Sequence, residues 1–398
     1  MSQVELIATA AFGVEAVVAR ELKALGFNDC FTENGKVTFR GGLEAIARAN
    51  LWLRSADRVL IKMGSFPATT FEELFERTKA LPWADWLPEN ACFPVIGKSV
   101  KSTLYSVPDC QAIVKKAVVE ALRTRYRRSW FDEDGPLYRI EVALLKDEAT
   151  LTIDTSGAGL HRRGYRPLAA NAPLRETLAA AMIQLSYWNA ERVFLDPFCG
   201  SGTLPIEAAL IGANIAPGLK RSFSAEQWPL IPKRIWLEAR EQAMDAILPQ
   251  SNLRIYGSDI DGEVLRLARR HAQLAGVDKC VFFQTLPVAE VRSRFKYGCV
   301  ICNPPYGERL GDQRQAESAY RDMRDSIGRL DTWSIYVLTN HPRFEQLFGR
   351  RADRKRKLYN GRIEVTYYQF FGPPPPTGRE NSATSRLSAA TIEQNETR

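Results

Sequence analysis

VFLDPFCGSGTLPIEAA, residues 193–209, joins a short apolar run to a turn with two glycines and then to a helical pattern. Glycines at 200 and 202 allow the backbone to approach a ligand closely, and the N-terminus of the following helix offers free N–H groups. The spacing matches neither the dinucleotide-binding pattern G-x-G-x-x-G nor a phosphate-binding loop with its lysine, which weakens both interpretations. The stretch predicts a strand, a ligand-binding turn and a helix, with a plain tight turn as the alternative.

The pattern around this stretch predicts the fold of the second half of the chain. From about residue 171 onward, short apolar runs alternate with longer helical patterns, as in a doubly wound sheet of parallel strands. The run KLYNGRIEVTYYQFF, residues 357–371, places Asn360-Gly361 between two strand-like segments and predicts an antiparallel hairpin at the end of that sheet. The expected parallel strands are residues 193–196, 253–259, 281–284, 297–303 and 333–339.

The first 165 residues show a different order of strand and helix patterns. Strand patterns at residues 4–10 and 36–40 surround a helical pattern at residues 14–25, which is typical of a small split βαβ, ferredoxin-like unit. A second module follows and ends in the hairpin pattern of residues 138–157, with Asp147 and Glu148 at the expected turn. We therefore expect two small α+β modules ahead of the doubly wound sheet.

Composition narrows the class of protein. The chain of 398 residues has a net charge of +8 and a pI near 9.1, a balance that favours a polyanionic partner. No stretch approaches the roughly 18–20 apolar residues that cross a bilayer, and the first residues lack a secretory signal pattern, so we expect a cytoplasmic protein. Seven scattered cysteines argue against a disulfide framework. Cys299 and Cys302 fall in a strand, where residues three apart point to opposite faces, so we expect buried thiols and no metal site.

GSDID, residues 257–261, ends the second expected strand with carboxylates at Asp259 and Asp261. A carboxylate at this edge of a doubly wound sheet can accept two hydrogen bonds from ribose hydroxyls. The alternative is that the acidic residues cap the following helix, which suits Asp261. Because a glycine turn precedes it in the sheet, we favour Asp259 as the ribose ligand.

CNPPYGERL, residues 302–310, follows a buried strand with an amide, two prolines and an aromatic ring. The amide oxygen of Asn303 and a backbone carbonyl held by Pro304 and Pro305 form two acceptors, which suit the two N–H donors of an exocyclic amine. Hydrogen bonds that favour pyramidalisation free the amine lone pair for attack on an electrophilic methyl, and Tyr306 offers a face for a flipped base. The alternative is a turn stiffened by proline with an incidental tyrosine.

DPFCGSGT, GSDID and NPPYGERL, in that order, resemble the class I, S-adenosylmethionine-dependent amino-methyltransferases. With GAGLHRRGYR and APLRETLAAAM, the chain is similar to the THUMP-containing bacterial large-subunit (23S) ribosomal RNA guanine-N2 methyltransferases over about residues 1–371. The resemblance implies an α/β class I methyltransferase sheet with a C-terminal antiparallel hairpin, preceded by α+β ferredoxin-like and THUMP modules. The implied domains are residues 1–65 (ferredoxin-like), 66–156 (THUMP, RNA-binding), 157–371 (methyltransferase) and 372–398 (a disordered tail).

The same resemblance assigns roles at the expected site. The cofactor would be S-adenosylmethionine, with the glycine turn binding its methionine part and Asp259 binding its ribose. Asn303 and the Pro304 carbonyl would bind the target amine, and Tyr306 would stack on the base. Relatives often carry an acidic residue after the third strand for the adenine amino group, whereas this chain has Pro287 near that place, with Gln284 and Thr285 as candidate substitutes. The candidate cofactor residues are Asp196, Pro197, Phe198, Gly200, Gly202, Thr203, Asp259, Asp261, Gln284 and Asn303, and the candidate catalytic residues are Asn303, Pro304, Pro305 and Tyr306.

Basic residues gather in three runs, 123–128, 161–166 and 349–357, two of which include a tyrosine. Any single run is most simply a solvated surface, but three together fit a surface that follows a nucleic-acid backbone. The candidate RNA-binding residues are Arg123, Arg125, Arg127, Arg128, Arg162, Arg163, Arg166, Arg354, Lys355, Arg356 and Lys357.

The predicted function is methyl transfer from S-adenosylmethionine to the N2 amine of a guanine in 23S ribosomal RNA, naked or within a pre-ribosomal large subunit. A transfer RNA guanine-N2 methyltransferase and a non-catalytic RNA-binding ribosome assembly factor are the alternatives. A DNA adenine-N6 enzyme would share NPPY, but the first half of the chain does not resemble a DNA-reading domain.

Overall fold

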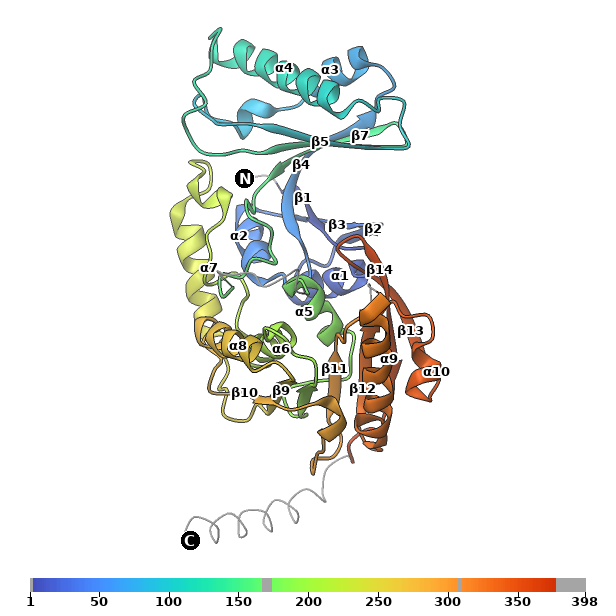
Figure 1. The fold of residues 1–398 in the computed structure, drawn as a ribbon. Coiled ribbons are helices and arrows are strands. Elements are labelled where there is room, and N and C mark those ends of the chain that lie inside the picture. Colours follow the sequence, from blue (N-terminus) through green and yellow to red (C-terminus); the bar gives the residue numbers. More distant parts are fainter. Residues whose placement is uncertain (1–2, 167–173, 307–309, 377–398) are drawn as a thin grey trace.

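The computed structural model describes residues 3–166, 174–306 and 310–376 and contains two seven-stranded sheets, one in each half of the chain (Figure 1). Of the predicted tail, residues 372–398, the part from residue 377 onward lies outside the described residues, as do residues 307–309 of the NPPYGERL run. The molecule is elongated, with the first sheet above the second in the view of Figure 1. Within the described part of the chain, no helix is long and apolar enough to cross a membrane.

The N-terminal sheet is one continuous layer with the strand order β2-β3-β1-β4-β7-β6-β5. Strand β4 joins its two halves, because residues 58–61 pair with β1 and residues 60–67 pair with β7. The predicted 65/66 boundary therefore falls inside a shared strand. The elements are β1 (Val4–Thr9), α1 (Glu15–Ala24), β2 (Cys30–Glu33), β3 (Lys36–Gly41), α2 (Leu43–Trp52), β4 (Arg58–Pro67), α3 (Phe71–Lys79), β5 (Val95–Val100), α4 (Val107–Tyr126), β6 (Ile140–Leu145) and β7 (Glu148–Asp154).

The second sheet has the order β10-β9-β8-β11-β12-β14-β13. Its first five strands are parallel, and β14 runs antiparallel to β12 and pairs with β13 in a hairpin. This order confirms the predicted class I methyltransferase sheet with its terminal hairpin. The elements are α5 (Glu176–Gln184), β8 (Phe194–Asp196), α6 (Thr203–Gly212), α7 (Lys233–Asp245), β9 (Ile255–Asp259), α8 (Gly262–Ala275), β10 (Val281–Thr285), β11 (Cys299–Cys302), α9 (Leu310–Asp325), β12 (Ser334–Thr339), α10 (Phe344–Phe348), β13 (Arg354–Asn360) and β14 (Ile363–Phe370). Single 3₁₀ turns occur at Trp83–Asp85, Ser224–Gln227, Val288–Glu290 and Ile327–Arg329.

Two predicted turns are shifted by one residue in the structure. In the terminal hairpin Asn360 pairs with Ile363, so the two-residue loop is Gly361-Arg362, and Gly361 adopts the positive φ of 65° that such a loop requires. In the β6–β7 hairpin Leu145 pairs with Glu148, and the loop is residues 146–147, both with positive φ. Turn chemistry thus located both hairpins, while cross-strand pairing set the register.

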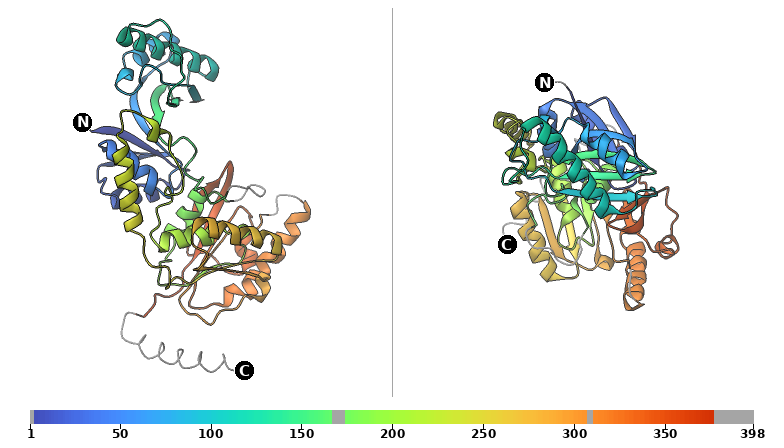
Figure 2. Two further views of the ribbon diagram at one scale, coloured as in Figure 1. Left: turned by 90° about the vertical axis from the view of Figure 1, so that its left-hand side faces the viewer. Right: turned by 90° about the horizontal axis from the view of Figure 1, so that it is seen from above.

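The segment between α6 and α7 fastens the second sheet to the first half of the molecule. The Gly218 N–H donates to the Leu51 carbonyl at 2.9 Å, and Trp228 stacks on Tyr138 with ring centroids 4.3 Å apart. Helix α7 lies against α2, as Figures 1 and 2 show. These contacts between elements distant in sequence form one buried apolar core that runs through both halves.

Candidate active site

The predicted chemical groups meet at one edge of the second sheet. Asp196 ends β8, Asp259 ends β9, and Asn303 follows β11 directly. All three strands are parallel neighbours in the order β9-β8-β11, so their carboxyl ends share one edge. In doubly wound sheets this edge is where ligands bind.

The two glycines of the turn after β8 serve different purposes. The N–H of Gly200 donates to Asp259 Oδ2 at 2.9 Å, and a Cβ added at Gly200 would meet no described atom within 4 Å. A Cβ added at Gly202 would come within 3.0 Å of Phe283 Cζ and 3.1 Å of the Ala268 Cβ. Both residues have positive φ. Gly200 therefore faces open space where a ligand can approach, whereas Gly202 allows the helix to pack closely on the sheet.

Asp196 is buried and shapes the turn. Its Oδ1 accepts the N–H of Phe198 at 3.0 Å, and 1 % of the residue is exposed. Burial raises the pKa of Asp196 well above its usual range, and the nearby charge of Asp259 raises it further. Pro197 and Thr203 lie at the start of the turn and at the first residue of α6. The roles of these residues toward a cofactor stay predictions.

The carboxylates of GSDID have separate structural partners. Asp259 holds the glycine turn through Gly200 and also accepts the Asp261 N–H at 3.1 Å. Asp261 is the N-cap of α8 and accepts the N–H of Glu263 at 2.8 Å and of Val264 at 3.4 Å, as the capping alternative expects. Gln284 is exposed near the end of β10. Asp259 is thus the residue that couples two strands at the edge.

Two tyrosines orient the Asn303 loop. The Tyr306 hydroxyl donates to Asn303 Oδ1 at 2.5 Å, which fixes the amide oxygen while leaving it a second lone pair. The Tyr320 hydroxyl on α9 donates to the Pro305 carbonyl at 2.8 Å and lies 2.9 Å from Thr339 Oγ1. Tyr320 is fully buried, so this anchor is shielded from water. The sequence predicted the stacking face of Tyr306 but missed its hydroxyl contact and Tyr320.

The cysteines near the edge are protonated thiols. Burial raises the pKa of Cys199 and Cys302 well above the usual value, and raises that of Cys299 to about 12. Cys299 and Cys302 belong to separate apolar clusters, as expected for strand residues that point to opposite faces. A protonated buried thiol is a poor nucleophile, so the candidate chemistry lies with the amide and carboxylates.

The structure corrects the RNA-binding assignment of Arg163. This guanidinium is fully buried, donates to the Leu160 carbonyl at 2.8 Å and to the Arg54 carbonyl, and pairs with Glu207 at 3.3 Å. The neighbouring Arg162 is exposed. Arg163 therefore fastens the linker to α6 and is shielded from any RNA.

The other basic residues have mixed surroundings. Arg166 pairs with Glu176 at 2.8 Å and lies 3.3 Å from Thr203 Oγ1, so it contacts the first residue of α6, directly after the glycine turn. The last four residues of the basic run at 349–357 lie in the terminal hairpin, because β13 begins at Arg354. On this strand Arg356 donates to the Gly13 carbonyl at 3.0 Å. The exposed members, whose RNA contacts stay predictions, are Arg123, Arg125, Arg127, Arg128, Arg162, Arg354, Lys355 and Lys357.

Sequence reasoning missed the buried charges beneath the turn. Glu207 is fully buried on α6 and accepts the Tyr165 hydroxyl at 3.1 Å in addition to the Arg163 pair. Burial and the Glu207 charge raise the pKa of Tyr165 well above its usual range. A signal existed, because Glu207 is the one charged residue in the apolar run LPIEAALIG. An acidic residue amid apolar neighbours in a helix calls for a buried partner.

Three family models match successive parts of the chain. Residues 5–60 match the RlmL ferredoxin-like domain, residues 68–154 the THUMP domain, and residues 163–369 the RMKL-like methyltransferase domain. The last match covers more than half of the chain.

Curated relatives agree with these models. The chain is 50% identical over 378 residues to the "Putative RNA methyltransferase YpsC" of Bacillus subtilis, covering 94% of this chain and 98% of that protein. It is 34% identical over 400 residues to the ribosomal RNA large subunit methyltransferase K/L of Syntrophotalea carbinolica, covering 94% of this chain and 55% of that longer protein.

Two solved structures share the fold over nearly the full length of the chain. A structure from Listeria monocytogenes, described as a predicted N6-adenine-specific DNA methylase, is 54% identical and superposes with a TM-score of 0.90 over 94% of this chain and 97% of that one. A structure described as "SMU.472, a putative methyltransferase complexed with SAH" is 46% identical, with a TM-score of 0.89 over 94% of this chain and all of that one. With the family models and the YpsC match, these likenesses show that the chain belongs to the RMKL-like methyltransferases with ferredoxin-like and THUMP domains.

Proposed function

We propose that the protein is an RNA methyltransferase that uses S-adenosylmethionine to methylate the exocyclic N2 amine of a guanine in 23S ribosomal RNA. The observation that carries this proposal is the oriented Asn303 amide oxygen, 2.5 Å from the Tyr306 hydroxyl, on the edge where Asp259 holds the glycine turn. The THUMP match and the similarity to the large-subunit methyltransferase K/L support RNA as the substrate.

The residues at the edge fit the proposed cofactor. Gly200 faces open space beside the N-terminus of α6, where backbone N–H groups can receive a carboxylate. Asp259 keeps acceptor capacity after its two backbone hydrogen bonds, which suits ribose hydroxyls. When bound, the cofactor would supply an electrophilic methyl group on a positively charged sulfur.

The residues after β11 would act on the target amine. Asn303 Oδ1 and the Pro304 carbonyl would accept the two N–H groups of the amine and hold its nitrogen toward the methyl group. The amine nitrogen would form a bond to the methyl carbon as the bond between that carbon and the sulfur breaks, and the nitrogen would then lose one proton to solvent. Because Tyr320 and Tyr306 already fix this loop, little reorganisation is needed when the substrate arrives.

Nucleoside mass spectrometry of ribosomal RNA, transfer RNA and DNA from a strain lacking the protein tests the proposal. We expect one methylated guanine to disappear from 23S ribosomal RNA and to return when the wild-type protein is supplied. Loss of a transfer RNA methylguanine, or of methyladenine from DNA, would show a different substrate. An unchanged set of modified nucleosides in all three would leave the assembly-factor alternative.

Replacing Asp259 by alanine should weaken cofactor binding about 10- to 100-fold, because hydrogen bonds to a charged group contribute roughly 1.5–3 kcal/mol. The substitution also frees the Gly200 N–H and loosens the turn. Isothermal titration with S-adenosylhomocysteine measures the effect, and Asp245→Ala is the control because Asp245 is exposed at the C-terminal end of α7. Equal affinities for wild type and Asp259→Ala would contradict the assignment.

A further inference from the structure

A cavity of about 380 Å³ lies where the N-terminal module meets the second sheet, and its lining comes from four distant parts of the chain. We call it the rim pocket and define it by the residues that the argument uses: Phe12, Asp57, Arg175, Thr177, Tyr359 and Gly361. Residues after β1, before β4, at the start of α5 and at the tip of the terminal hairpin thus converge. Neither the sequence motifs nor the comparisons assign a role to this pocket.

The β13–β14 hairpin places the rim pocket on the active-site edge of the sheet. Thr366 pairs with Thr339 at the carboxyl end of β12, and the hairpin continues to Ile363. Three further residues of strand extend about 10 Å beyond that edge. The hairpin tip at Gly361 therefore stands above the edge that carries Asn303.

The sheet order also decides on which side of Asn303 the pocket lies. Strands β8 and β9, with the glycine turn and Asp259, lie on one side of β11, whereas β12, β14 and β13 lie on the other. The cofactor residues that we propose thus occupy one half of the edge, and the rim pocket overhangs the opposite half. A substrate that approaches Asn303 from the side opposite the cofactor would pass the rim pocket.

Helix α5 connects the rim pocket to the glycine turn. Glu176, the first residue of α5, pairs with Arg166, and the same Arg166 nitrogen lies 3.3 Å from Thr203 Oγ1 at the start of α6. Thr177 and Arg175 are the neighbours of Glu176 in the chain and line the pocket. The start of α5 is therefore fixed next to the turn proposed to hold the cofactor.

The chemistry of the rim pocket suits a nucleotide. Phe12 is 54% exposed and meets the Tyr359 ring edge-on, with ring centroids 5.9 Å apart. Asp57 accepts the Thr177 hydroxyl at 3.1 Å and keeps acceptor capacity for base N–H groups. Arg175 is exposed, and within the described residues its guanidinium has neither an ion pair nor a hydrogen bond. An aromatic face, a carboxylate and an unpaired arginine match a base and its phosphate.

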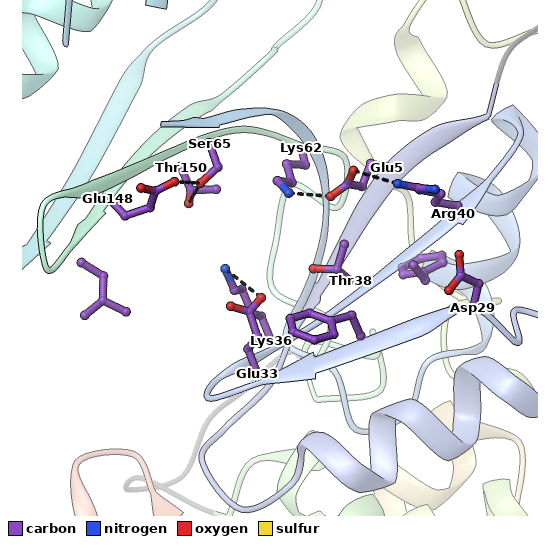
Figure 3. A pocket seen from close by; sticks show the side chains of 13 residues that line it. Glu5, Asp29, Glu33, Lys36, Thr38, Arg40, Lys62, Ser65, Glu148 and Thr150 are labelled. Atoms are coloured by element: carbon purple, nitrogen blue, oxygen red, sulfur yellow. Dashed lines mark hydrogen bonds and ion pairs between the residues drawn. The ribbon is translucent and has the colours of Figure 1, made fainter. Parts of the chain in front are cut away.

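A second, larger cavity, in the N-terminal sheet, also has an exposed aromatic ring but differs from the rim pocket in its charges. The cavity of about 650 Å³ in Figure 3 also has an exposed phenylalanine, Phe31, at 67%. Its cations, however, are paired: Lys62 and Arg40 with Glu5, and Lys36 with Glu33. Among the described residues, the lining of that cavity therefore has no cation without an ion pair to receive a phosphate, whereas the rim pocket has Arg175.

We infer that the rim pocket binds one nucleotide of the substrate RNA next to the target guanine, with its base stacked on Phe12 and its phosphate on Arg175. This inference rests on the proposed function, since it places RNA at the Asn303 edge. Arg362, which follows Gly361 at the hairpin tip, is exposed and also lacks an ion pair or hydrogen bond within the described residues. It extends the positive surface along the path of the RNA.

The test uses the full chain and ribosomal RNA purified from a strain lacking the protein. Phe12→Ala should weaken RNA binding and raise the KM for RNA about tenfold, the loss of one base stack, with kcat and the affinity for S-adenosylhomocysteine within twofold of wild type. Phe31→Ala is the matched control, because it removes an exposed phenylalanine from the same module outside the rim pocket, and it should change neither value by more than twofold.

The salt dependence of RNA binding tests the phosphate contact separately. Arg175→Gln should reduce the slope of log Kd against log salt by about one, and Arg175→Lys should restore it. Unchanged binding by Phe12→Ala, or equal losses in Phe12→Ala and Phe31→Ala, would overturn the inference. If the wild-type protein transferred no methyl group to this RNA, the proposed function would fail, and the binding measurements would still decide whether the pocket holds a nucleotide.

Discussion

An Asn303→Ala enzyme is expected to transfer methyl groups to ribosomal RNA at least about a hundredfold more slowly than wild type, as when one preorganised hydrogen-bonding group is lost from an active site. The alanine removes the Oδ1 that Tyr306 orients, so the target amine loses its fixed acceptor. Incorporation of a radiolabelled methyl group under single-turnover conditions measures the rate.

Three measurements give this prediction a clear control. The affinities of Asn303→Ala for S-adenosylhomocysteine and for ribosomal RNA should stay within a few-fold of wild type, because Asp259 and the glycine turn are untouched. Tyr306→Phe keeps an aromatic face and loses the hydroxyl contact, so its rate should fall far less. A methylation rate for Asn303→Ala equal to that of wild type would remove the basis of the proposed mechanism.

The second large effect is on stability, at Arg163. Replacing it by alanine leaves Glu207 fully buried without its cation, and breaking a buried pair in this way costs roughly 3–5 kcal/mol. The contacts of Arg163 with the Leu160 and Arg54 carbonyls are lost at the same time. We expect the thermal unfolding midpoint to fall by roughly 10 °C, followed by circular dichroism.

Arg162 provides the matched comparison, because it is the adjacent arginine and is exposed. Arg162→Ala should leave the unfolding midpoint within about 1 °C of wild type, as surface substitutions usually do. If both variants unfolded at the wild-type temperature, the Arg163–Glu207 pair would contribute nothing to stability. If Arg163→Ala kept its stability and lost only RNA affinity, the original RNA-binding assignment would return.

The fold of the second half could be predicted from sequence because its signals are local. Each parallel strand is a short apolar run followed by turn residues, and the Asn360-Gly361 signal lies one residue from the observed loop. The N-terminal half was predicted less completely. The shared strand β4 pairs with β1 and with β7, and β7 lies about 90 residues further along the chain. Pairing over such a distance leaves no local pattern that says which strands will be neighbours.

The candidate site could likewise be predicted only in part from the sequence. The glycine turn, Asp259 and Asn303 can each be recognised in the sequence at the end of a predicted strand. Because the strands are parallel, the three groups lie at one edge of the sheet. The hydrogen-bond partners of these groups cannot be recognised from the sequence. Tyr320 reaches the Pro305 carbonyl from α9, 15 residues away, and Gly200 meets Asp259 across 59 residues.

By itself, the sequence determined the class I sheet, the residue types at its reactive edge and the basic character of the chain, since turn chemistry, periodicity and charge are properties of neighbouring residues. Only the tertiary structure decided that Arg163 is buried beside an exposed Arg162, and that Phe12, Asp57, Arg175 and Tyr359 surround one cavity. The physical reason is that burial and pocket shape depend on which distant segments pack together, and that choice is made by the free energy of the whole core.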